Sequence, residues 1–82
     1  MPLRTPTHIG GVINLRRLGQ TIADRRREMH LTQVDLAKRT QRHQADISRL
    51  ERGLNEPTLQ TLANIAHVLQ MDTLELIARA FD

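Results

Sequence analysis

Apolar residues recur at intervals of three and four along most of this chain, which is the spacing of one face of an α-helix. Leu15, Leu18, Ile22 and Met29 follow this period and predict a helix from about residue 15 to residue 29. Four further segments show the same spacing, and we expect them to begin near residues 32, 44, 58 and 72. Outside the short stretch from residue 9 to residue 13, nothing alternates with the period of two that is typical of a strand. The pattern predicts an all-α chain, folded as a compact five-helix bundle.

Polar residues that cap helices stand at the expected helix ends. Thr32 with Asp35, and Asp72 with Glu75, have the three-residue spacing of a capping box. Gly53 follows the third helix, where a residue with positive φ commonly ends a helix. These residues support the predicted boundaries independently of the apolar pattern.

Residues 32–53 predict two short helices joined by a tight corner, the second running from about residue 44 to residue 52. Ile47 and Leu50 face the core, so the opposite side of the second helix is left to other residues. Four residues share that side and form what we call the outward strip: Gln44, Ala45, Ser48 and Arg49. Such a pair of helices places one helix against a duplex backbone and the next in the major groove. We therefore predict that the chain binds double-stranded DNA.

The outward strip has the chemistry to read base edges. Gln44 can form two hydrogen bonds to adenine, Arg49 can pair with guanine O6 and N7, and Ala45 can touch a thymine methyl group. Ser48 can bond to several bases, although a plain solvated position is an equal alternative for it. We predict that these four residues contact the bases.

A second set of residues is expected to contact phosphates, because it lies at helix starts or carries positive charge. The set comprises Thr32, Gln33, Arg42, His43 and Arg16. Asp46 is unexpected on a recognition helix, since phosphates repel a carboxylate. It can accept a hydrogen bond from cytosine N4, or pair with Arg42 or Arg49, and the sequence leaves these alternatives open.

The net charge of +3 is distributed unevenly along the 82 residues. Residues 1–52 hold 11 of the 12 Lys and Arg residues against 5 acidic ones, whereas residues 53–82 hold 1 basic and 4 acidic residues. The basic half contains the predicted helix pair, as expected for a surface that meets phosphates. A solvated, arginine-rich surface would give the same distribution.

Composition and motifs exclude several other classes. The chain has no cysteine, and its four histidines lack the spacing of a zinc site, so we expect no metal and no cofactor. It contains no phosphate-binding glycine loop and no nucleophile motif, and we predict that it is not an enzyme. No apolar run is long enough for a membrane span or a secretory signal, so we expect a cytoplasmic location and no membrane partner.

Together, these residues resemble the helix-turn-helix domain of the lambda-repressor/Cro (XRE) family. The resemblance covers residues 15–77 and rests on the segments Leu31-Thr32-Gln33, Leu36-Ala37, Ile47 to Gly53, Pro57-Thr58-Leu59, Leu62, Ile65-Ala66 and Leu69. It implies that Gln33 and Gln44 contact phosphate and base, and that Ala45 and Arg49 read bases. It also implies an ion pair between Arg26 and Glu51 that joins the first helix to the third, and a bacterial or phage origin.

The sequence departs from the family at three corners where glycine is common. These positions hold His30, Gln41 and Gln70. A residue other than glycine held at positive φ costs roughly 1 kcal/mol or more. Either these corners are strained, or the turns are built differently.

One recognition helix reads only about four base pairs, so we expect a homodimer whose two helices are about one DNA turn apart. The predicted dimer contacts are the apolar residues of the last helix and the C-terminus: Leu74, Ile77, Ala80 and Phe81. The alternative is that Ile77 and Phe81 merely cover the core.

The first 14 residues contain two prolines and a Gly-Gly pair, and we predict a flexible arm there, followed by the DNA-binding domain over residues 15–82. The arm can remain a loose tail, reach around DNA through Arg4, or become ordered on a partner through residues 9–13. That last possibility supports a second hypothesis, in which the protein is an antitoxin that neutralises a toxin and binds DNA secondarily.

Overall fold

The computed structural model describes residues 12–81, and this part of the chain contains five helices. They are α2 (Leu15–Glu28), α3 (Gln33–Thr40), α4 (Gln44–Glu51), α5 (Leu59–Val68) and α6 (Thr73–Ala78). Each begins within one residue of the position expected from the sequence. The prediction of an all-α, five-helix fold is confirmed for the described residues.

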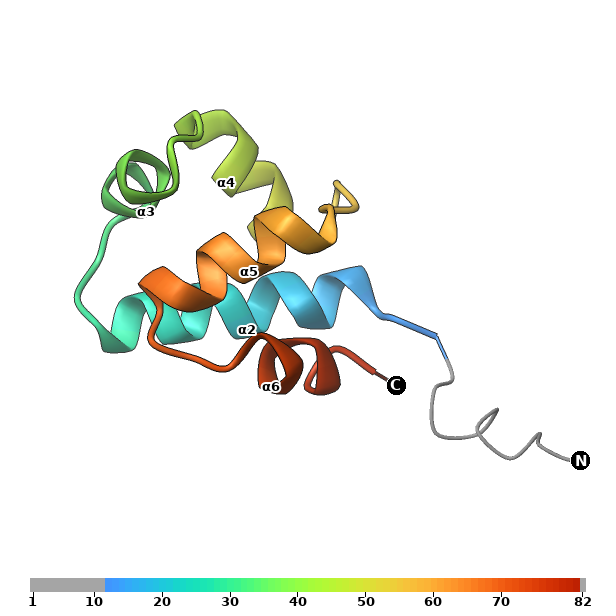
Figure 1. Ribbon diagram of the computed structural model, residues 1–82. Helices are drawn as coiled ribbons and strands as arrows, with labels where there is room; N and C mark the ends of the chain where they lie inside the picture. The colour runs from blue at the N-terminus through green and yellow to red at the C-terminus, as the bar shows by residue number, and fades with distance from the viewer. Residues whose placement is uncertain (1–11, 82) are drawn as a thin grey trace, which may run out of the picture.

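The helices surround one hydrophobic core (Figure 1). α2 packs against α4 and α6, α5 packs against α3 and α6, and α3 with α4 lies at the opposite end of the bundle from α6. Every helix contributes at least one fully buried side chain: Leu18, Ile22, Leu36, Ile47, Ile65, Leu69 and Leu76. Both α3 and α4 are therefore packed directly on the core, and this packing fixes the corner between them.

Local hydrogen bonds set the starts of the helices. The Thr32 side chain accepts from the Asp35 N–H at 3.0 Å, and the Asp35 carboxylate accepts from the Thr32 N–H at 2.8 Å, which completes the predicted capping box. The backbone and side chain of Thr32 lower the pKa of Asp35 by bonding to its charged form. The second predicted box differs: Asp72 caps α6 by accepting from Leu74 N–H, whereas Glu75 pairs with Arg79 at 2.6 Å.

The two ends of the described chain lie side by side. Ile13 forms an antiparallel bridge with Phe81, and the Asn14 N–H donates to the Ala80 carbonyl at 2.7 Å. Asn14 also caps α2 by accepting from the Arg17 N–H. Ile13 and Asn14, which the sequence analysis places in the arm, therefore contact the C-terminal end of the described chain and the start of α2. Residues 1–11 of the predicted arm lie outside the described residues.

Three corners have the left-handed backbone that the family usually builds with glycine. His30, Gln41 and Gln70 have φ values of 59°, 58° and 56°, and Gly53 has φ of 75°. The turns thus keep the conformation typical of glycine although three of them carry a side chain. The alternative that these turns are built differently is excluded.

Gln41→Gly is expected to stabilise the protein by about 1 kcal/mol, because the steric cost of a left-handed side chain disappears. Thermal unfolding measures the gain as a rise of several degrees in Tm. Arg52→Gly is the matched control, since Arg52 ends α4 with φ of −88° and is also exposed. The control should lower Tm, because glycine there only adds freedom to the unfolded chain. A Tm that falls equally in both variants would contradict the expected gain.

Candidate nucleic-acid interface

The outward strip of α4 is open to solvent. Gln44, Ala45 and Arg49 are exposed and Ser48 is half-buried, while Ile47 and Leu50 of the same helix are buried at 1% and 5% exposure. α4 therefore has one face in the core and its opposite face available to a ligand. Three of the four strip residues are thus free to meet a DNA duplex, as the DNA hypothesis requires.

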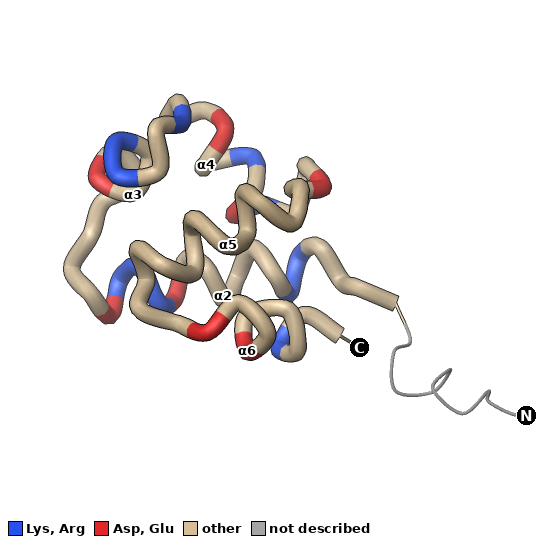
Figure 2. Tube along the Cα trace, viewed as in Figure 1, with Lys and Arg blue, Asp and Glu red and all other residues tan. Residues whose placement is uncertain are grey.

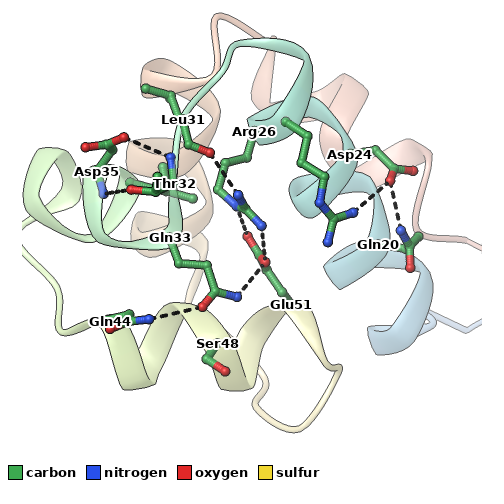
Figure 3. A network of polar contacts seen from close by, with 12 residues as sticks. Gln20, Asp24, Arg26, Leu31, Thr32, Gln33, Asp35, Gln44, Ser48 and Glu51 are labelled. Carbon is green, nitrogen blue, oxygen red and sulfur yellow. Dashed lines mark hydrogen bonds and ion pairs between the residues drawn. The ribbon is translucent and has the colours of Figure 1, made fainter.

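A chain of polar contacts connects α2, α3 and α4 behind this strip (Figure 3). Arg26 forms a two-point ion pair with Glu51, at 2.7 Å from Nε to Oε2 and 3.0 Å from Nη2 to Oε1. Its third nitrogen donates to the Leu31 carbonyl at 2.8 Å. The two side chains are only 9% and 5% exposed. The hydrogen bonds that Arg26 donates to the Glu51 carboxylate raise the pKa of Arg26, with burial acting in the opposite direction.

The polar chain continues from this ion pair to the outward strip. Gln33 Nε2 donates to Glu51 Oε1 at 2.9 Å, and Gln44 Nε2 donates to Gln33 Oε1 at 3.4 Å. Since Glu51 accepts from the amide nitrogen of Gln33, the amide oxygen of Gln33 must face Gln44. The buried ion pair thus orients the amide of Gln33, and Gln33 in turn orients the amide of Gln44.

The other residues that are predicted to contact phosphates lie in different environments. Thr32 is exposed, but its hydroxyl accepts in the cap of α3. His43 is exposed, and its side chain makes no capping hydrogen bond to α4. Arg16 is exposed on α2, where its backbone contacts Gly53 just beyond α4. Lys and Arg also gather on α3, on α4 and in the turn between them (Figure 2).

Arg42 is tied to the scaffold by a contact that sequence reasoning missed. Its guanidinium donates a short hydrogen bond to the hydroxyl of Thr61 on α5. Thr61 is only 7% exposed, and it also bonds to the cap residue Thr58. Nineteen residues separate Arg42 from Thr61, so no local pattern in the sequence signals this pair.

The four predicted dimer residues lie in different environments. Ala80 is 1% exposed and packs in the core, because its backbone is held against Asn14. Leu74 is 74% exposed, and Ile77 and Phe81 are half-buried. The apolar surface at this end of the molecule therefore comes from Leu74, Ile77 and Phe81, with Ile13 beside Phe81.

Residues 12–81 contain neither a candidate metal site nor a helix suited to a membrane. No three His, Cys, Asp or Glu residues are grouped closely enough to hold a metal ion. No helix of this part is both long and apolar enough to cross a membrane.

Comparison with known proteins places residues 22–76 in the helix-turn-helix family HTH_3. The chain is 35% identical over 57 residues to the "ImmF control region 10 kDa protein" of Bacillus phage phi105, matching 70% of this chain and 63% of that relative. The chain thus spans less than two thirds of that relative's length.

Solved structures agree with this match. The clp gene regulator ClgR of Corynebacterium glutamicum has a TM-score of 0.75 and 26% identity, covering 79% of this chain and 69% of that one. SinR, a master regulator for biofilm formation solved in complex with DNA, has a TM-score of 0.68 and 28% identity, covering 72% and 95%. These proteins are regulators and not enzymes, which confirms the corresponding prediction.

Proposed function

Because this chain belongs to the HTH_3 helix-turn-helix family, we propose that it is a DNA-binding transcription regulator that recognises specific sequences as a homodimer. The observation that carries the proposal is the exposed outward strip of α4 with its base-reading side chains fixed from behind. SinR, similar in fold, was solved in complex with DNA, and the phage relative belongs to a control region. The cytoplasmic location stays a prediction.

The hydrogen bond from Gln44 to Gln33 supports adenine as the base read by Gln44. One amide hydrogen of Gln44 is directed to Gln33 Oε1. The second amide hydrogen and the amide oxygen of Gln44 remain for adenine N7 and N6. A glutamine in free rotation would lose more side-chain entropy on binding than one already oriented by a neighbour.

The positive surface supports contact with phosphates. Arg16 on α2 and Arg42 in the turn before α4 are both exposed. The N-terminus of α3 adds backbone N–H groups, which favour an anion. Such contacts position the protein without reading sequence, and they make affinity depend on salt.

Selection of bound sequences from a random pool of duplexes tests the proposal directly. The wild type should enrich a site with two similar halves about one DNA turn apart. Arg49→Ala should then lose about 1–3 kcal/mol of discrimination at one position of each half-site. Arg16→Ala should instead weaken binding to every sequence and reduce the salt slope by about one.

Arg79→Ala is the matched control for both arginine variants, because Arg79 is exposed at the C-terminal end of α6, where it pairs with Glu75. It should change neither preference nor salt slope. Equal loss on all sequences for Arg49→Ala would remove Arg49 from the base-reading residues. No enrichment by the wild type at low salt would overturn the proposal.

The dimer is proposed to form through Leu74, Ile77 and Phe81. Leu74→Glu is expected to shift the protein to monomers at micromolar concentration and to weaken binding to the full site, measured by sedimentation and by titration. Leu74 is the cleanest choice, because at 74% exposure it adds little to the core. Leu59→Glu is the control, since Leu59 is 67% exposed on α5. A Leu74→Glu protein that stays dimeric would exclude this surface.

The antitoxin role stays a prediction and an alternative. Copurification of a toxin encoded beside the gene would favour it, and such a result is compatible with DNA binding by α4.

A further inference from the structure

Asp46 is a carboxylate on the helix proposed to enter the major groove. It is the third residue of α4 and lies within one turn of the outward strip. Its Oδ1 atom accepts from Arg49 Nη2 at 2.7 Å, and the side chains of Asp46 and Arg49 are 37% and 44% exposed. The acid is thus attached to one of the residues proposed to read bases.

The structure shows whether Asp46 pairs with Arg42 or with Arg49, which the sequence leaves open. Asp46 lines a groove between α4 and the start of α5, together with Arg42, Glu56 and Thr58. Arg42, however, donates to Thr61 instead of to Asp46. The Asp46 carboxylate bonds to Arg49, three residues later on the same helix.

The pairing leaves Arg49 able to bind a base. A guanidinium has five N–H donors in a planar fork, and the bond to Asp46 uses one of them. Guanine O6 and N7 need two donors. A carboxylate on one edge of the fork therefore restricts its orientation without occupying the donors that guanine requires.

The Asp46 carboxylate also affects the affinity of the protein for DNA that lacks guanine at the Arg49 position. An unrestrained arginine can turn to a phosphate, a contact that carries no sequence information. If Arg49 turns in this way, Asp46 loses its partner and faces the negative backbone alone. That cost falls on mismatched DNA and not on the correct site, so it increases the difference between them.

We propose that Asp46 is a specificity-determining residue, which positions the Arg49 guanidinium for guanine and whose charge weakens binding to DNA without that base. The inference rests on the proposed function and adds a residue to it. Asp46 acts through Arg49, so it is a positioning residue rather than a base contact.

Asp46→Asn tests the proposal, because asparagine keeps the shape and removes the charge. We expect preference for guanine at the Arg49 position to fall roughly three- to tenfold, a part of the discrimination that a two-bond contact provides. Binding to random duplex at low salt should rise by about two- to fivefold, since one negative charge near phosphates is gone. Glu75→Gln is the control, because it removes the acid of a similar exposed pair on α6. It should change neither quantity.

A double-mutant cycle separates positioning from other roles. In an Arg49→Ala background, Asp46→Asn should leave base preference unchanged, because the residue through which Asp46 acts is absent. Loss of preference at a neighbouring cytosine, present in either background, would show that Asp46 reads a base itself and would overturn the proposal. Thermal unfolding of Asp46→Asn should stay close to wild type, as expected for an exposed pair.

The outcomes also distinguish this inference from the proposed function. A wild type that enriches a site, together with an Asp46→Asn protein of unchanged preference, overturns the role of Asp46 alone. A wild type that retains no duplex at low salt overturns both.

Discussion

Glu51→Ala is expected to lower the free energy of unfolding by about 3–5 kcal/mol, because it leaves a buried guanidinium without its partner. Arg26 bonds to Glu51 at two points, and both side chains are almost fully removed from water. Gln33 loses its acceptor in the same variant. Urea unfolding monitored by circular dichroism measures the loss.

The double variant Arg26→Met with Glu51→Leu shows whether the unpaired charge is responsible. Replacing both charges by apolar groups of similar size should restore much of the stability lost in Glu51→Ala. DNA preference at the Gln44 position should stay impaired, because Gln33 no longer has an acceptor that orients it. A Glu51→Ala protein within 1 kcal/mol of wild type, roughly the value of an exposed pair, would show that water reaches this ion pair.

Gly19→Ala is expected to destabilise the protein by about 1–3 kcal/mol although alanine favours helices over glycine. A Cβ atom at residue 19 would lie 2.4 Å from the Glu51 carbonyl oxygen and 2.5 Å from that of Leu50. Both obstacles are backbone atoms at the end of α4, so no side chain can move aside. Relief requires α2 and α4 to separate, which also displaces the proposed recognition helix.

Unfolding and operator titration together measure this second effect. Gln20→Ala is the matched control, because residue 20 is exposed on the same helix and gains no such clash. Its stability should stay near that of wild type. Gly19→Ala should lose both stability and affinity, and an increase in stability would show that the two helices tolerate a methyl group between them.

The agreement between sequence and structure is greatest for features built from neighbouring residues. The capping box joins Thr32 and Asp35, which are three positions apart, and it formed as predicted. Gly53 ends α4 with positive φ. The capping box predicted for Asp72 and Glu75 did not form. Glu75 could bond to the Asp72 backbone N–H or to Arg79, and in the structure it pairs with Arg79.

The family resemblance extended prediction to one distant pair. Arg26 and Glu51 are 25 residues apart, and the structure brings them together. Periodicity alone gives no reason to join them, because many arginines and acids share the surface of this chain. The sequence likewise left the conformation of the corners at His30, Gln41 and Gln70 open. That conformation depends on how the helices on both sides of each corner pack.

By itself, the sequence determined the five helices, their starts and the side of α4 that is polar, because caps and apolar spacing act within a few residues. Only the tertiary structure decided that Ala80 is buried, that Arg42 reaches Thr61, and that Gly19 must lack a side chain. Each of these depends on the distance between residues far apart in the chain. That distance is set by how the helices pack around the shared core, and no local pattern contains it.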